Sequence, residues 1–397
     1  MGEKLRVEHL YKIFGSHPER AMQMLREGLD KNAIFKQTGM TIGVNDASFS
    51  IDEGEVFVVM GLSGSGKSTL VRMLNRLIEP TSGRIVLDGQ DVTAMSVAEL
   101  RDMRRKNMSM VFQSFALMPH RTVVDNAAFG LEVAGMGRRK RRQAALAALE
   151  AVGLATHANS YPDELSGGMQ QRVGLARALA VNPSILLMDE AFSALDPLIR
   201  TEMQDELLRL QQEETRTVVF ISHDLDEAIR IGDRIAIMEG GSIAQVGTPE
   251  EIVNNPANDY VQSFFYGVDV SQVFSAGDVA TRKQVTLIQR PGVDVATALE
   301  HLREHEGTSA VVVGRDRRYQ GLVSEDSLRE QLRSTAQDRL SRAMLEEVEP
   351  LSAEMPLSEV VGKVADSRWP LPVVDGDGRY VGSITKTALL HVLKKAG

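Results

Sequence analysis

Short apolar runs of strand length alternate with amphipathic stretches between about residues 44 and 245. The runs are 55-EVFVVM-60, 84-RIVLDG-89, 184-SILLMD-189, 217-TVVFIS-222 and 233-DRIAIME-239. Strands of a parallel sheet are buried on both faces, so they read as continuous apolar runs separated by helices. The pattern therefore predicts an α/β domain built on a largely parallel sheet.

Residues 16–42 interrupt the strand-rich start of the chain. Their apolar side chains recur at helical spacing, at Met22, Leu25, Leu29, Ile34 and Phe35. This spacing predicts a helical hairpin inserted into the domain. The alternative is a DNA-binding helix-turn-helix, which the acidic balance of the chain disfavours.

The C-terminal part of the chain repeats itself at a constant offset of 61 residues. The residues Val312, Val313, Arg318, Tyr319, Gly321 and Leu328 recur as Val373, Val374, Arg379, Tyr380, Gly382 and Leu389. Each copy is too small to bury both of its faces alone, so we expect the two copies to pack together. The predicted organisation is a domain at 1–265, a linker at 266–282 and repeats at 283–335 and 340–397.

Composition narrows the class of protein. The 397 residues include 45 basic and 54 acidic side chains, and the net charge of −9 argues against a general nucleic-acid binder. The absence of cysteine excludes disulfides, thiolate metal sites and cysteine nucleophiles. No apolar run approaches the roughly 18 to 20 residues that cross a bilayer. Because the N-terminus also lacks the apolar stretch of a signal peptide, we expect the chain to stay in the cytoplasm.

A glycine-rich loop follows the first buried strand and precedes a helical run. Residues 61-GLSGSGKS-68 satisfy the pattern G-x-x-x-x-G-K-[ST], in which backbone N–H groups cradle phosphate oxygens. Lys67 would reach the β and γ phosphates, and the Ser68 hydroxyl would hold Mg²⁺. The chain is therefore predicted to bind a nucleoside triphosphate. The predicted contacts are Gly61, Ser63, Gly64, Ser65, Gly66, Lys67, Ser68 and Thr69.

The apolar strand 184–189 ends in Asp189, which is followed directly by a second acid, Glu190. Ligands bind α/β sheets at the carboxyl ends of the strands, which is where these acids stand. Asp189 is suited to holding Mg²⁺, and Glu190 is suited to polarising the water that attacks the γ phosphate. Seen alone, such a pair is more often part of a solvated loop, but its position in a chain with a phosphate loop favours a site.

A second anion site is predicted at the start of the helix within 165-LSGGMQQRVGLARALAVNP-183. Ser166 is placed to cap the helix, and Gly167 and Gly168 expose backbone N–H groups at its positive end. A loosely capped helix is the simpler interpretation. However, one nucleotide needs only one phosphate cup, so the second is explained if it closes on a nucleotide held by another copy.

These motifs together resemble those of ABC-type ATPases over about residues 4–250. LSGGMQ resembles the family's signature, Gln113 its glutamine loop, 193-SALD-196 its D-loop and His223 its switch histidine. The resemblance implies a head-to-tail dimer, with each ATP held between one chain's phosphate loop and the other's signature. It further implies that Gln113 contacts Mg²⁺, that His223 holds the γ phosphate and that Asp196 acts across the interface.

The residue that stacks on adenine and the C-terminal repeats are also interpreted through resemblance to known families. Phe14 matches the aromatic residue that stacks on adenine, and Tyr11 is the alternative because the 16–42 insertion blurs the alignment. The whole chain resembles the ATP-binding subunits of osmoregulated glycine betaine/proline importers, and its tail resembles paired CBS domains. The ribose-binding aspartate of nucleotide-binding CBS domains is replaced here by Ser327 and Ala388, which leaves open whether the pair binds a nucleotide or senses ionic strength.

The resemblance implies a P-loop ABC-type domain with a helical subdomain, followed by a tandem CBS pair of α+β type. Its function would be to hydrolyse ATP with Mg²⁺ and to energise an importer of compatible solutes. The expected partners are a second copy, a transmembrane permease, a solute-binding protein and, through Arg138, Arg139, Lys140, Arg141 and Arg142, anionic lipid. The expected location is the cytoplasmic face of the inner membrane. A soluble ABC ATPase acting on nucleic acid or ribosomes and an importer ATPase for another solute remain alternatives.

Overall fold

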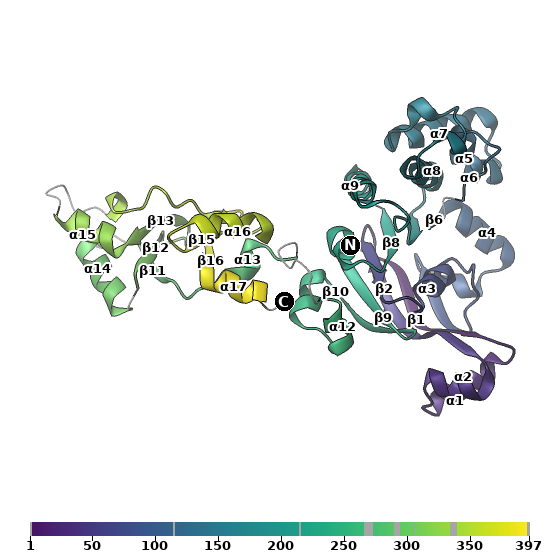
Figure 1. Ribbon diagram of the computed structural model, residues 1–397, viewed down its shortest axis with the longest axis horizontal. Coiled ribbons are helices and arrows are strands. Elements are labelled where there is room, and N and C mark those ends of the chain that lie inside the picture. Colours follow the sequence, from purple (N-terminus) through teal and green to yellow (C-terminus); the bar gives the residue numbers. More distant parts are fainter. Residues whose placement is uncertain are drawn as a thin grey trace. The chain divides into compact units, whose positions relative to one another are not determined.

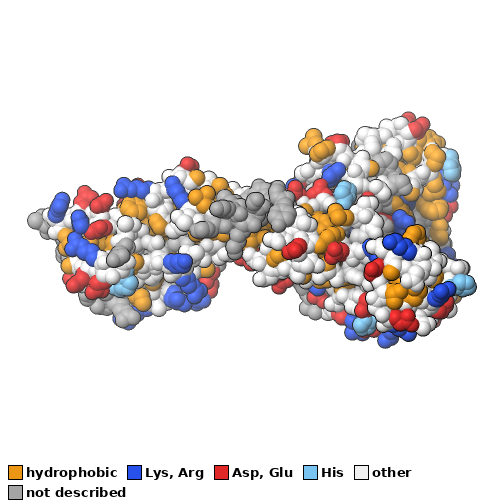
Figure 2. Space-filling model, turned by 60° about the horizontal axis from the view of Figure 1, so that its bottom comes forward, with side chains coloured by type: hydrophobic (Ala, Val, Ile, Leu, Met, Phe, Trp, Pro, Cys, Tyr) orange, Lys and Arg blue, Asp and Glu red, His pale blue; other side chains and the backbone are white. Residues whose placement is uncertain are grey.

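The computed structural model describes residues 2–113, 116–213, 216–265, 273–289, 294–305, 307–333 and 340–394. The chain divides into two compact units, Met1–Phe264 and Phe265–Gly397. Figure 2 shows acidic and basic side chains interspersed over the described surface of the face that it presents. No helix within the described ranges has both the length and the apolar composition needed to cross a lipid bilayer.

Unit 1 contains two sheets (Figure 1). In one sheet the order is β10 (Ser242–Gly247), β9 (Arg234–Glu239), β3 (Val56–Met60), β8 (Thr217–Ser222), β7 (Ile185–Asp189) and β6 (Met108–Phe112). All neighbours in it are parallel except β9 and β10. The other sheet is antiparallel, in the order β2 (Thr41–Asp52), β1 (Glu3–Phe14), β4 (Ser82–Leu87) and β5 (Gln90–Asp91).

The main core of unit 1 joins the two sheets around α3 (Lys67–Leu74). Buried residues of both sheets and of α3 form one apolar cluster. Within it Phe49 of β2 stacks on Phe57 of β3, with ring centroids 5.1 Å apart. Because α3 begins at the phosphate loop and its other end is anchored in this core, the loop is fixed to a rigid element.

The remaining helices of unit 1 lie around the sheets or form a separate group beside one of them. Figure 1 shows α5 to α8 gathered together as a helical subdomain, and α8 contacts β6, the edge strand of the parallel sheet. The helices are α4 (Val97–Lys106), α5 (Val123–Ala127), α6 (Phe129–Val133), α7 (Arg138–Ala151), α8 (Gly167–Ala180), α9 (Pro197–Glu213), α10 (Leu225–Ile231), α11 (Pro249–Asn254) and α12 (Asp259–Ser263).

Two helices, α1 (Pro18–Arg26) and α2 (Lys31–Thr38), lie within the 16–42 segment. They are inserted at the tip of the β1–β2 pair, where Phe14 is paired with Thr41. The α1–α2 pair shares a small apolar core with the flanking strands, since the cluster that includes Met22 and Ile34 also includes Ile13 of β1 and Ile42 of β2. The insertion is therefore packed against the tip of the β1–β2 pair.

One strand expectation needs correction. The run 84–89 was grouped with the strands of the parallel sheet, but its residues 84–87 belong to β4 in the antiparallel sheet. There Leu87 is paired with Leu5 of β1. An apolar run shows that a strand is buried, but it does not specify the partner strand.

Unit 2 consists of two repeats with the same topology. The first contains β11 (Val285–Ile288), α14 (Val295–Glu304), β12 (Ser309–Val313), β13 (Tyr319–Ser324) and α15 (Glu325–Arg333). The second contains β14 (Leu351–Ser352), α16 (Leu357–Asp366), β15 (Leu371–Val374), β16 (Tyr380–Ile384) and α17 (Lys386–Lys394). Their registers also match, since Val312 is paired with Gly321 and Val373 with Gly382.

The two repeats are joined edge to edge at their turns. Arg318 and Arg379 form an antiparallel bridge, flanked by hydrogen bonds from Tyr319 N to Gly378 O (3.0 Å) and from Tyr380 N to Arg317 O (2.9 Å). Part of the segment expected as a linker also packs on the second repeat. Its helix α13 (Ala276–Val279) contacts this repeat and is followed by Thr281, which pairs with Ser383. Residues 266–272 of the expected linker lie outside the described residues.

Candidate nucleotide site

The phosphate loop, residues 61–66, connects β3 to α3 as the sequence predicts. At Gly66 the backbone has φ +104°, and a Cβ there would lie 2.2 Å from the carbonyl oxygen of Gly43. At Gly61 φ is +153°, and a Cβ would lie 2.4 Å from the carbonyl oxygen of Met238. Only glycine fits both the conformation and the space at these two positions.

Lys67 is the first residue of α3, and only 5% of it is exposed. Its Nζ donates hydrogen bonds to the carbonyl oxygens of Gly61 (2.8 Å) and Leu62 (3.1 Å), so the ammonium group lies against the phosphate loop. Burial lowers the pKa of Lys67, while the charges of Glu190 and Asp189 act in the opposite direction. An anionic ligand bound at this loop would replace the interactions with water that the buried Lys67 ammonium group has lost.

Asp189 is 3% exposed, and two side chains of α3 donate hydrogen bonds to its carboxylate. The Ser68 hydroxyl donates to Asp189 Oδ1 at 2.8 Å. The Arg72 guanidinium contacts Asp189 Oδ2 through Nε at 3.1 Å and Nη2 at 2.9 Å. The pair of Ser68 and Asp189 oxygens is the kind of hard donor set that Mg²⁺ prefers.

The strand register brings the remaining motif residues to one edge of the parallel sheet. Asp189 is paired with Phe112 of β6 and with Ile221 of β8, and Met60 of β3 is paired with Ser222. Each of these four strands therefore ends at the same edge. The residues that follow them are Gly61, Gln113, Glu190 and His223.

Glu190 has a left-handed backbone, with φ +48°, immediately after β7. Its carbonyl oxygen accepts a hydrogen bond from the Ser193 hydroxyl at 2.9 Å, and Gln113 Nε2 donates to the same hydroxyl at 3.2 Å. A non-glycine residue in this region is strained, and such strain concentrates at functional sites. His223 is exposed at the end of β8.

The signature segment lies at the N-terminus of α8. Ser166 caps the helix by accepting a hydrogen bond from Met169 N at 3.4 Å, and Ser166 and Gly167 are exposed. A Cβ at Gly168 would lie 2.5 Å from Ile199 Cγ2 of α9, so glycine also allows the close packing of these helices. The free helix N-terminus faces solvent, and its unpaired N–H groups suit an anionic ligand.

Two further predicted residues have identifiable positions. Asp196 precedes α9 and accepts a hydrogen bond from Ile199 N at 3.1 Å. Phe14 is 42% exposed, and its ring covers Gly43, where a Cβ would lie 2.7 Å from Phe14 Cε2 and 3.4 Å from Thr69 Cγ2. Tyr11 instead packs on the core of the α1–α2 insertion. Of the two aromatic candidates, Phe14 is thus the one that lies, together with Thr69 of α3, close to Gly43.

Comparisons with known proteins identify the family to which the chain belongs. A family model for the ABC transporter matches residues 44–193, and one for the CBS domain matches residues 340–395. The glycine betaine/proline betaine transport system ATP-binding protein ProV of Escherichia coli (strain K12) is 58% identical over 398 residues, covering 100% of this chain and 99% of the relative. The chain belongs to the ABC transporter ATP-binding proteins. The predicted resemblance and the predicted fold class are confirmed.

Other similarities agree with this family. The glycine betaine/carnitine transport ATP-binding protein GbuA of Listeria monocytogenes serotype 1/2a (strain 10403S) is 49% identical over 390 residues, covering 98% of this chain and 97% of the relative. A solved dimer of the ATP-binding cassette MJ0796 in a post-hydrolysis state with ADP and Pi is 31% identical, with a TM-score of 0.52. The match covers 62% of this chain and 98% of that chain.

The site of this ABC protein contains contacts that the motifs did not predict. Arg72 binds the predicted metal ligand Asp189, and Ser193 joins Gln113 to the backbone of Glu190. Tyr260 Oη donates to Met238 O at 3.1 Å and accepts from Leu62 N at 3.4 Å, which fixes one side of the phosphate loop. Only Arg72 had a signal in the sequence, since it lies four residues after Ser68 and so on the same helix face.

The phosphate loop also fits an anionic ligand by an independent criterion. The Ser65 hydroxyl is 5% exposed and has no hydrogen-bond partner among the described residues. A buried hydroxyl without a partner is costly, and a phosphate oxygen in the loop would satisfy it. The loop therefore fits a nucleotide, and the Ser68–Asp189 pair fits Mg²⁺.

Proposed function

We propose that two copies of the chain bind two Mg·ATP head to tail and hydrolyse them to drive a permease that imports glycine betaine or a related quaternary amine. The observation that carries the proposal is the single sheet edge that joins the phosphate loop, Asp189, Glu190, Gln113 and His223. The exposed signature helix supplies the complementary half of each site.

Nucleotide binding uses both backbone and side chains of the phosphate loop. Residues 61–69 would surround the phosphates, with Lys67 as the cation and the Ser65 hydroxyl as an additional donor. Phe14 would stack on the adenine, because its exposed ring and Thr69 of α3 both lie close to Gly43 of β2. Ser68, Asp189 and Gln113 would hold Mg²⁺, which neutralises charge on the phosphate oxygens when it is bound.

The chemistry assigned to the protein is proton transfer and charge stabilisation during attack of water on the γ phosphorus. Glu190 orients the attacking water and accepts its proton, while Lys67 and His223 stabilise the negative charge that develops on the phosphoryl oxygens. The hydrogen bonds through Ser193 connect Glu190 to Gln113 and therefore connect the chemistry to the end of β6.

The dimer is supported by the signature and D-loop residues. Ser166, Gly167 and Gly168 expose a helix N-terminus that has no nucleotide of its own chain to bind, and Asp196 starts the next long helix. The similar cassette MJ0796 was solved as a dimer with ADP and Pi. In the proposed assembly each signature closes on the γ phosphate of the partner's ATP.

A permease is proposed as the membrane partner, fed by a solute-binding protein, because ProV is named as the ATP-binding protein of a transport system and GbuA as a transport ATP-binding protein. A groove of about 470 Å³ between α4, β6, α6 and α8 is a suitable docking site on unit 1. Its apolar lining includes Met110 of β6 and Phe129 of α6, and β6 leads directly to Gln113. A partner seated there at the cytoplasmic face of the inner membrane would be coupled to the nucleotide site.

The transported solute is inferred from the relatives. Their names share glycine betaine and add proline betaine or carnitine, all of which carry a quaternary ammonium group. The CBS pair is proposed to regulate the ATPase, and Ser327 favours a role other than adenylate binding. Its hydroxyl donates to Ser324 O at 3.0 Å and accepts from Ser324 N at 3.0 Å, so it is engaged within its own turn.

The decisive variant is Glu190→Gln, which removes the proton acceptor but keeps the shape of the side chain. We expect ATP hydrolysis to fall on the order of 100-fold or more while ATP binding persists. With ATP and Mg²⁺ the variant should accumulate as a dimer in size-exclusion chromatography, and the wild-type chain should return to monomers after hydrolysis. Near-normal turnover by the variant would contradict the assignment of Glu190.

The same variant tests the transport role in cells. Coexpressed with the proposed permease and solute-binding protein, the wild-type chain should support uptake of labelled glycine betaine, and Glu190→Gln should abolish it. Uptake of proline, choline and carnitine in the same cells measures selectivity. ATPase activity without uptake of any of these solutes would reject the quaternary amine assignment but retain the enzyme.

A further inference from the structure

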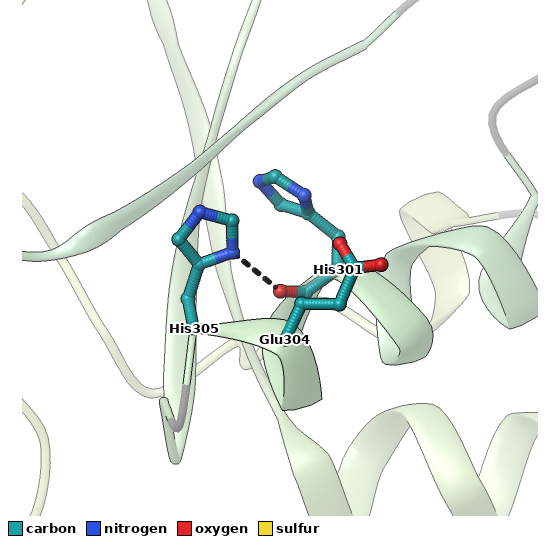
Figure 3. Close-up of side chains that lie close together, drawn as sticks. All are labelled: His301, Glu304 and His305. Carbon is teal, nitrogen blue, oxygen red and sulfur yellow. Dashed lines mark hydrogen bonds between the residues drawn. The ribbon is translucent and has the colours of Figure 1, made fainter.

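Two imidazoles and one carboxylate converge at the C-terminal end of α14 in the first repeat of unit 2. The residues are His301, Glu304 and His305, and one ligand atom from each lies within 4.8 Å of the other two. Figure 3 shows both rings on the same side of the helix end, with the Glu304 carboxylate beside them. Glu304 and His305 are exposed, and His301 is half-buried.

A hydrogen bond prepares one of the imidazoles for a metal. His305 Nδ1 lies 2.9 Å from the carbonyl oxygen of His301. Since a carbonyl oxygen can only accept, Nδ1 carries the proton and the Nε2 lone pair of the neutral ring is left as a ligand. Metal-bound histidines generally have this arrangement, with the second ring nitrogen donating to a carbonyl or carboxylate.

The local electrostatics also favour a cation at this position. The cluster occupies the last turn of α14, and the C-terminal end of a helix carries a partial negative charge. The nearest basic residue on this turn, Arg303, is directed to Glu325, with Nε 3.5 Å from the carboxylate. The Arg303 charge is therefore partly compensated by α15.

We propose that His301, Glu304 and His305 bind a divalent transition-metal ion of the Zn²⁺ or Ni²⁺ class, with water at the remaining coordination positions. Two imidazole nitrogens and one carboxylate oxygen suit these ions and disfavour Mg²⁺ and Ca²⁺, which prefer oxygen ligands. Histidines at positions i and i+4 face the same side of a helix, which is the spacing that chelation requires.

A modest rearrangement is needed to close the cluster on an ion. In tetrahedral coordination, bonds of about 2.0 to 2.2 Å place two ligand atoms about 3.3 to 3.6 Å apart. The present separation of up to 4.8 Å exceeds this by roughly 1 Å. Rotation of the Glu304 and His305 side chains can close this gap, because both are exposed.

The test is a calorimetric titration of the full chain with ZnCl₂, using protein purified without a histidine tag. Excess MgCl₂ is present throughout, so that oxygen sites such as the one at Asp189 are occupied. The wild-type chain should bind one Zn²⁺ per chain, and His301→Gln and His305→Gln should each weaken binding at least about 10-fold. His157→Gln changes a half-buried histidine in unit 1 and should leave the affinity unchanged.

Thermal unfolding distinguishes loss of a ligand from loss of the fold. Zn²⁺ should raise the unfolding temperature of unit 2 in the wild-type chain and should fail to do so in the double variant His301→Gln/His305→Gln. Equal unfolding temperatures without Zn²⁺ would show that the double variant folds. Equal Zn²⁺ affinity in wild type and double variant, or displacement of Zn²⁺ by excess Mg²⁺, would overturn the proposal.

Discussion

At the scale of single residues, Glu227 holds the loop that carries His223. Glu227 is 8% exposed, and its two carboxylate oxygens accept hydrogen bonds from the Ser222 hydroxyl and from Gln204 Nε2 (3.1 Å). Ser222 also accepts from Asp224 N at 3.0 Å, so the residues on both sides of His223 are tied to this carboxylate. Burial raises the pKa of Glu227, and its hydrogen bonds oppose that shift.

The raised pKa gives a pH-dependent stability with a definite sign. A group whose pKa is higher in the folded than in the unfolded chain contributes stability below its unfolded value, here about 4.5, and loses it as the pH rises through the folded value. Glu227→Gln removes the ionisable group but can still accept from Gln204 and donate to Ser222. The variant's gain in unfolding free energy relative to wild type should therefore grow as the pH rises above about 4.5, then level off.

Chemical denaturation of both proteins across this pH range measures the difference, and the contributions of ionisable groups that both proteins share cancel in the comparison. A difference that is constant with pH would show that Glu227 is not the titrating group. Comparison of ATPase activity in the same proteins tests whether the uncharged side chain still positions His223.

The sequence best predicts those site residues whose positions follow from a local motif. Lys67 and Ser68 are specified by their distance from Gly61 along the chain, and the structure places them at the loop. Ser193 and Glu227 act through partners on other strands and helices, such as Gln113, 80 residues away from Ser193. Such contacts depend on sheet order, which no local spacing contains.

At the scale of elements, the loop between β3 and α3 offers a matched pair of glycines. Gly64 (φ +80°) and Gly66 (φ +104°) both have left-handed backbones, but only a Cβ at Gly66 meets another atom, the Gly43 carbonyl oxygen at 2.2 Å. A Cβ at Gly64 has nothing within 4 Å. Alanine substitutions at these two positions therefore distinguish the cost of a left-handed backbone from the cost of steric overlap.

Gly64→Ala should lower the free energy of unfolding by about 1 to 2 kcal/mol, the cost of a left-handed L-residue. Gly66→Ala carries the same cost and must also displace β2 from the loop, so its loss should be larger, about 3 kcal/mol or more. Denaturant unfolding of the two variants gives the comparison. Equal losses would show that the loop and β2 separate easily.

The sequence predicts a helix or strand well where the pattern of apolar residues within that segment determines it. The apolar strands and the repeat offset are local properties, and the matching registers of β12–β13 and β15–β16 follow the repeat. The sheet to which β4 belongs and the packing of α13 against the second repeat depend on contacts between distant segments. A pattern of apolar positions does not encode those contacts.

At the scale of the whole molecule, the net charge of −9 does not exclude local basic surfaces. One such surface is the start of α7, where Arg138, Arg139, Lys140 and Arg142 are exposed. Arg141 differs from them, since its guanidinium lies 3.6 Å from Glu132. We propose that the four exposed side chains contact anionic headgroups, at about 1 kcal/mol per charge and within a Debye length of about 8 Å.

Replacing the four exposed side chains of α7 with glutamine should strongly reduce sedimentation of the chain with vesicles that contain phosphatidylglycerol. The attraction is electrostatic, so wild-type binding should fall as KCl rises, whereas the variant should bind weakly at every concentration. A control variant with Arg20, Arg26, Lys31 and Lys36 of the α1–α2 insertion changed to glutamine removes the same charge from another exposed surface. If both variants lose binding equally, net charge rather than α7 attracts the membrane; if neither does, the lipid contact is wrong.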